Sequence, residues 1–141
     1  MIKIIGFFIC IVALFSCEFS PNKDMVKKAP VMYKPSEMAL LMRRMYEVNK
    51  VVKGQIIRKD TLLPFPNTFL TIHSAILTEP SDRDIEFDSL AKEFINNQER
   101  TFSSSSDSTV IYFNKSISTC VACHENRCTG PIPKIKKLLI H

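Results

Sequence analysis

Two cysteines and a histidine near the end of this chain have a spacing that can support redox chemistry. Cys120 and Cys123 are three residues apart, and His124 follows the second cysteine directly. On an α-helix, residues three and four apart project from the same side, so both thiols and the imidazole would face one surface. Cysteine–x–x–cysteine–histidine is the signature of covalent haem attachment. The motif therefore predicts one haem c bonded to Cys120 and Cys123, with His124 as an axial ligand of its iron.

Three other uses of these residues compete with haem. A zinc site could take Cys120, Cys123, His124 and Cys128, but these four would crowd one helical turn, where adjacent side chains point about 100° apart. A thioredoxin-like pair needs a preceding strand and a dithiol at a helix start, whereas this motif lies near a helix end. A structural disulfide between cysteines three apart on a helix has poor geometry and leaves Cys128 over. The spacing favours haem over all three.

The first residues predict export from the cytoplasm, and covalent haem attachment takes place outside the cytoplasm in bacteria. Lys3 precedes an apolar run over residues 4–15, which is too short to span a bilayer but suits a secretory signal. The run ends in Leu-Phe-Ser-Cys at residues 14–17, which resembles the processing box of bacterial lipoproteins. The alternative is an ordinary signal peptide that ends near a cysteine. We expect a signal peptide over residues 1–16, lipidation of Cys17, and a periplasm-facing lipoprotein anchored in the cell envelope.

The charge balance is too mild and too dispersed to indicate a nucleic-acid partner. The chain has 19 basic and 14 acidic residues, and loss of Lys3 with the signal peptide leaves a net charge of +4. Residues 18–35 carry three prolines and scattered charges, which is typical of a tether. We therefore predict a lipid-anchored tether over residues 17–35 and a single domain over residues 36–141.

Four segments of the domain have helical periodicity. The first follows Ser36, a candidate N-cap, and its stripe is Met38, Leu41, Met42, Met45, Asn49, Val52 and Ile56. The second begins after Pro66, with a shared face of Phe69, Ile72, His73, Ile76 and Leu77. The third follows residues 79–84, with the stripe Phe87, Leu90, Ala91 and Phe94. The fourth has Asp107 as a candidate cap and the stripe Val110, Phe113, Ile117, Cys120, Val121 and His124. No alternation of period two competes, so the pattern predicts an all-α fold, a four-helix bundle.

These segments and the motif resemble the cytochromes c-prime and their low-spin, methionine-ligated relatives, the class II c-type cytochromes. The resemblance covers residues 36–128 and rests on "CVACH" in the last helix and on "LMRRM", residues 41–45, in the first. It implies a four-helix bundle that binds haem c, with Met42 as the distal ligand of the iron. The chain departs from the family at Cys128, where the family often has arginine, and Arg127 comes one residue earlier.

Several residues have open roles. Met38 and His73 are alternatives to Met42 as distal ligand, and the methionines can equally be core residues. Arg43 and Arg44 can pair with haem carboxylates or form an exposed basic face. We expect Cys128 to be a buried thiol or to lie near the haem edge, and the segment that follows it has no assignment.

These expectations define three functional hypotheses. The leading one is a non-enzymatic electron-transfer protein with one haem iron, which meets redox partner proteins of the envelope. The second is a five-coordinate haem protein whose distal face is closed by apolar side chains and which binds a diatomic gas for sensing or detoxification. The third, a haem peroxidase, ranks last because the sequence shows no distal histidine and arginine arrangement. A homodimer is left open.

Overall fold

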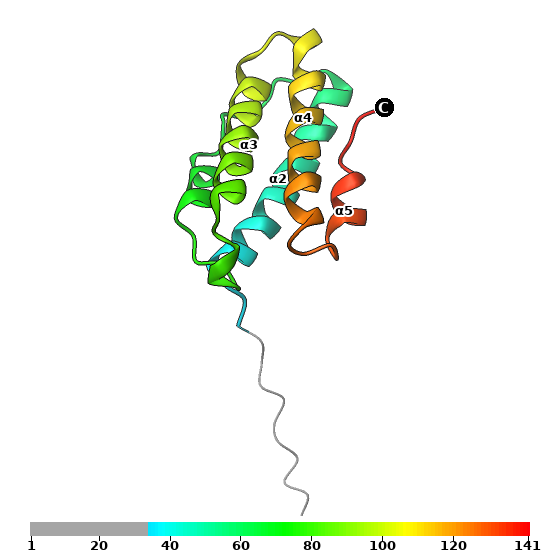
Figure 1. Ribbon diagram of the computed structural model, residues 1–141. Helices are drawn as coiled ribbons and strands as arrows, with labels where there is room; N and C mark the ends of the chain where they lie inside the picture. The colour runs from blue at the N-terminus through cyan, green and yellow to red at the C-terminus, as the bar shows by residue number, and fades with distance from the viewer. Residues whose placement is uncertain (1–33) are drawn as a thin grey trace, which may run out of the picture. The chain divides into compact units, whose positions relative to one another are not determined.

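Three long α-helices and a 3-10 helix form most of the domain in the computed structural model, which describes residues 34–141 (Figure 1). The elements in chain order are α2 (Glu37–Arg58), η2 (Asn67–His73), η3 (Pro80–Asp82), α3 (Ile85–Ser103), α4 (Ser106–Glu125) and α5 (Ile132–Lys136). The described range contains no strand, so the predicted all-α fold with four packed helices is confirmed. The predicted signal peptide, Cys17 and most of the predicted tether lie outside the described residues.

The ends of α2 are defined by its two capping residues. The Ser36 hydroxyl oxygen accepts a hydrogen bond from the amide of Ala39 at 3.1 Å, which satisfies one of the free donors at the helix start and confirms the predicted N-cap. Lys59 ends the helix in the left-handed region at φ 58°, and its amide donates to the carbonyls of Gln55 and Ile56. This residue reverses the chain direction after α2, as glycine does in many proteins.

The predicted second α-helix is wrong in its type, because η2 is a 3-10 helix that starts after Pro66. A 3-10 helix has three residues per turn, so positions three apart stack on one face. Phe69, Ile72 and Ala75 follow this period and are buried. The α-helical period had placed His73 and Ile76 on the buried face, and both are exposed.

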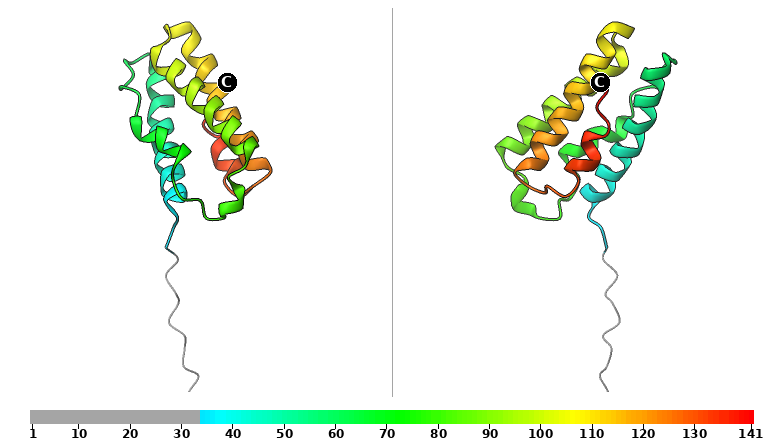
Figure 2. Two further views of the ribbon diagram at one scale, coloured as in Figure 1. Left: turned by 60° about the vertical axis from the view of Figure 1, so that its left-hand side comes forward. Right: turned by 90° about the vertical axis from the view of Figure 1, so that its right-hand side faces the viewer.

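The chain runs up α2, down through η2 to η3, up α3 and down α4 (Figures 1 and 2). The N-terminal ends of α2 and α3 therefore meet the C-terminal end of α4. Helix α5, which the sequence did not predict, lies between α4 and α2 (Figure 2). Its Ile135 packs with Val52 of α2 and Ile117 of α4 in one apolar cluster.

Two helix starts differ in how well they were predicted. Helix α4 begins at Ser106 with Ser105 as its N-cap, so the predicted cap Asp107 lies inside the first turn and not before it. Helix α3 has Asp84 as its N-cap, whose carboxylate accepts from the amide of Phe87 at 2.7 Å. The acidic segment before the third stripe had indicated such a cap.

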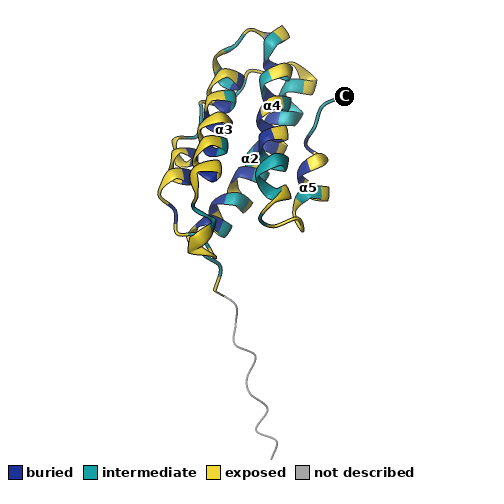
Figure 3. Cartoon of the chain, viewed as in Figure 1, coloured by how far each residue is buried: buried dark blue, intermediate teal, exposed yellow. Residues whose placement is uncertain are grey.

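A buried polar contact connects the three long helices at mid-height. The Gln98 side chain of α3 is fully buried, and its Nε2 donates to Asn49 of α2 and to Ser116 of α4, both at 2.8 Å. The buried residues of all three helices face one another, while the outer face of α3 is exposed (Figure 3). Because buried polar groups need partners, this contact fixes the register of the helices. No helix in residues 34–141 is long and apolar enough to cross a membrane.

Replacement of Lys59 by glycine should stabilise the domain by about 0.5–1 kcal/mol, because a residue with a Cβ atom is strained in the left-handed region. The matched control is Lys50→Gly, at an exposed position inside α2, which should destabilise by about 1 kcal/mol. Urea unfolding midpoints of the three proteins measure both effects. A lower midpoint for Lys59→Gly would contradict the capping role.

Candidate functional site

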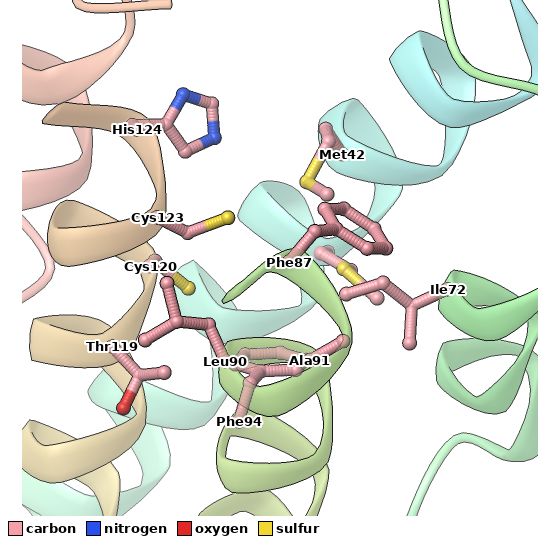
Figure 4. Close-up of a pocket in the computed structure, with 11 residues that line it drawn as sticks. Met42, Ile72, Phe87, Leu90, Ala91, Phe94, Thr119, Cys120, Cys123 and His124 are labelled. Carbon is pink, nitrogen blue, oxygen red and sulfur yellow. The ribbon is translucent and has the colours of Figure 1, made fainter. Parts of the chain in front are cut away.

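The predicted attachment residues line an apolar cavity between α2, α3, α4 and η2 (Figure 4). Helix α4 contributes Cys120, Cys123 and His124 from its last turns. The other lining residues are Met42, Met45, Ile72, Phe87, Leu90, Ala91, Phe94 and Thr119. The cavity has a volume of about 30 Å³, which is room for about one water molecule. Side chains of the predicted third stripe thus form the wall opposite the two thiols.

The two cysteines that line the cavity are neutral thiols at ordinary pH. Burial raises the pKa of the Cys120 thiol to about 12, and the nearby Cys123 acts in the same direction. Burial also raises the pKa of Cys123, which the positive charge of Arg127 partly opposes. Because the thiolate is the nucleophilic form of cysteine, this environment makes both thiols slow nucleophiles.

The His124 imidazole has one nitrogen fixed by the turn that follows α4. Its Nδ1 lies 3.0 Å from the backbone carbonyl oxygen of Cys128. A carbonyl oxygen only accepts, so this contact is a hydrogen bond in the tautomer that has the proton on Nδ1 and the lone pair on Nε2. The ring extends from α4 toward the side of the cavity where Met42 lies (Figure 4). This is the arrangement of a metal-ligating histidine, whose second nitrogen is oriented by a hydrogen bond.

The three candidates for the distal position lie in different surroundings. Met42 of α2 lines the cavity and is half-buried, with its side chain pointing into the space that faces α4 (Figure 4). Met38 is buried in the core and does not line the cavity, and His73 is exposed at the end of η2. Met45 also lines the cavity, nearly one turn further along α2, and was not among the predicted candidates. Arg43 and Arg44 are exposed on α2.

Cys128 differs from the expectation of a buried thiol, because it is exposed. Its Sγ lies 3.0 Å from Nδ1 of His124, beside the carbonyl that accepts from the same nitrogen. The adjacent Arg127 is the residue that sequence reasoning missed: its side chain is only 8% exposed and forms an ion pair with Asp84 at 2.6 Å. In the sequence, only its position three residues after His124 indicated that Arg127 lies near the site.

The alternative uses of the motif find little support in the geometry. The described residues contain no group of three or more His, Cys, Asp or Glu side chains that could hold a metal ion. Cys120, Cys123 and Cys128 are free thiols. The pair Cys120 and Cys123 lies near the end of α4, whereas a thioredoxin-like dithiol lies at a helix start.

The residues around the cavity provide the donor set that a covalently attached haem requires. Two neutral thiols, a free imidazole nitrogen and a thioether face one apolar space. Nη1 of Arg127 is buried without an acceptor among the described residues, and such a donor costs about 1–3 kcal/mol. A carboxylate-bearing group such as haem could satisfy it. Ligand pockets usually measure about 300–1,000 Å³, so binding requires the walls of the cavity to move apart.

Comparison with known protein families, with curated proteins and with solved structures finds no match to this chain. The resemblance to class II c-type cytochromes therefore remains a prediction from the sequence motifs.

Alkylation before haem attachment should follow burial and thiol pKa. Cys128 should react first, because it is exposed, and Cys120 last. At pH 8 a thiol with a pKa of about 12 has about a thousandth of the thiolate of an ordinary cysteine. Its alkylation rate should rise about tenfold per pH unit up to pH 11. Mass spectrometry of iodoacetamide-treated protein measures the order, and urea-unfolded protein, in which all three should react alike, is the control. Equal rates at Cys120 and Cys128 in the folded protein would contradict the buried site.

Proposed function

We propose that this chain is a c-type cytochrome that carries one covalently attached haem and transfers electrons at the bacterial cell envelope. The observation that carries the proposal is the orientation of His124. The Cys128 carbonyl holds Nδ1, so Nε2 is free as a ligand at a cavity that Cys120, Cys123 and Met42 also line. When bound, haem iron supplies one-electron chemistry between its ferrous and ferric states.

Each residue of the cavity has a defined part in this proposal. Cys120 and Cys123, nearly one helical turn apart on α4, would hold the group through thioether bonds. The Nε2 lone pair of His124 and the thioether of Met42 on α2 would be the ligands of its iron. The apolar side chains of Phe87 and Leu90 exclude water from the site. A dry site with histidine and methionine ligands favours a raised reduction potential.

The proposed location follows from the N-terminal sequence. The signal-like residues 1–16 and the lipoprotein-like box that ends at Cys17 support attachment to a membrane of the envelope. Acyl chains anchor through buried CH₂ groups, each worth about 0.8 kcal/mol. The domain would then meet redox partner proteins of the envelope through its tether.

A five-coordinate haem that binds a diatomic gas is the second candidate. One observation favours it: Phe87 and Met42 both line the cavity (Figure 4). An aromatic side chain in this place can close the distal face and leave the sixth position of the iron open. The choice between the two functions therefore depends on whether Met42 ligates the iron.

The covalent attachment is tested on the purified holoprotein. Acid-acetone extraction should leave the haem colour on the polypeptide, and the double variant Cys120→Ala, Cys123→Ala should release it. Cys128→Ala is the matched control and should retain the colour, because Cys128 does not line the cavity. A colourless wild-type protein that contains one zinc ion per chain would refute the proposed function.

The distal ligand is tested by Met42→Ala. A six-coordinate low-spin iron should become high-spin and bind carbon monoxide rapidly. Its reduction potential should fall by on the order of 100 mV, since different axial ligands change haem potentials over about 0.8 V. Met38→Ala, the same truncation in the core, should leave the spectrum unchanged. If wild-type ferric protein is already high-spin and Met42→Ala changes nothing, the gas-binding function replaces electron transfer. If the iron is low-spin and only Met45→Ala opens it, Met45 is the ligand.

A further inference from the structure

A buried arginine connects the turn after α4 to the start of α3. Only 8% of the Arg127 side chain is exposed, and its Nη2 donates to Asp84 at 2.6 Å and to Glu86 at 3.3 Å. Its Nε donates to the backbone carbonyl of Asp82 at 3.4 Å. A guanidinium that is withdrawn from water needs acceptors in place of the lost hydration. It therefore stays buried only while these acceptors remain in place.

Asp84 is the residue at which two parts of the site converge. The same carboxylate oxygen, Oδ1, accepts from Nη2 of Arg127 and from the amide of Phe87. The second of these bonds caps α3 and sets the first turn of the helix, from which Phe87 reaches the cavity. The position of Phe87 in the cavity wall and the position of Arg127 thus both depend on this one oxygen atom.

The same turn orients the imidazole of His124. The amides of Arg127 and Cys128 both point to the His124 carbonyl, at 3.4 and 3.1 Å, which makes the turn tight. The Cys128 carbonyl then returns to Nδ1 of His124 at 3.0 Å. Because Cys128 directly follows the anchored Arg127, movement of the arginine would displace the acceptor of Nδ1.

We propose that the Arg127–Asp84 pair is a positioning device: it holds the turn whose carbonyl orients His124, and so sets the strength of the bond from Nε2 to the haem iron. This inference rests on the proposed function, since it concerns the haem-bound state. Arg127 touches no reacting atom and acts through the Cys128 carbonyl. Loss of the Nδ1–H···O bond makes an imidazole a weaker donor, which favours the ferrous state.

The test measures the iron–histidine stretching band by resonance Raman on the carbon monoxide photoproduct of reduced holoprotein, together with the reduction potential. Arg127→Ala should move the band to lower frequency and broaden it, and the potential should rise. Asp84→Asn should produce the same changes, because asparagine still caps a helix but carries no charge for Arg127. The double variant should add little to either change. If Arg127→Ala fails to fold, Asp84→Asn carries the test, since it keeps the cap.

The controls separate positioning from stability. Arg100→Ala removes an arginine that contacts Tyr112, away from the cavity, and should leave band and potential unchanged. Cys128→Ala keeps the carbonyl but removes the thiol that also contacts Nδ1 of His124; a band shift smaller than that of Arg127→Ala supports the proposal, and a shift as large would show that the thiol orients His124 and would overturn it. A lower unfolding midpoint with an unmoved band in Arg127→Ala would overturn it as well. A wild-type protein without covalent haem would overturn both this inference and the proposed function, whereas an unmoved band in coloured protein overturns only the inference.

Discussion

The return of the chain from the end of α2 to the start of α3 decides where every other element lies. Residues 59–84 cross the length of the domain as an irregular segment with η2 in its middle (Figure 1). Pro64 and Pro66 exclude an α-helix before η2, because proline lacks the amide donor and restricts the residue before it. As a result, α2 and α3 start at the same end, and α4, which follows α3 through a short loop, ends there. The histidine-bearing end of α4 meets the first turns of both helices for this reason.

Apolar side chains surround the cavity and replace water around it. A nitrogen or sulfur lone pair of a lining residue therefore has few hydrogen-bond partners nearby. The Cys120 thiol stays neutral there, since burial raises its pKa to about 12. His124 is the exception, because its Nδ1 has a backbone acceptor outside the apolar space. The outcome is a site in which one nitrogen lone pair and several sulfur atoms face the same small volume.

Much of this fold follows from local sequence, and the part that does not has identifiable causes. The stripes of α2 and α3 and the Ser36 cap are periodic or local signals, and most of the stripe residues are buried. In α4 only Phe113 and Ile117 of the predicted stripe are buried, whereas Thr109, Ser116 and Thr119 are buried without having been predicted. Helix η2 was misjudged because a period of three and one of 3.6 share Phe69 and Ile72 and diverge only after them, at His73 and Ile76. Helix α5 has five residues, too few to show a period. The contact of Arg127 with Asp84 joins residues 43 positions apart, and no local pattern encodes such a pair.

The three methionines of α2 illustrate how packing distinguishes residues that sequence treats alike. Met38, Met42 and Met45 are spaced by four and three residues, so they share one face of α2. They differ mainly in their position along the helix axis, by about 1.5 Å per residue. Met38 and Met45 are 7% and 5% exposed and belong to the apolar core, whereas Met42 is half-buried at its edge. A buried methionine that moves out of the core leaves a cavity behind. Truncation of such a side chain leaves a comparable cavity and lowers the free energy of unfolding by about 2–5 kcal/mol. Movement of Met42 toward an iron would disturb less packing, which is an energetic reason to place the distal ligand there.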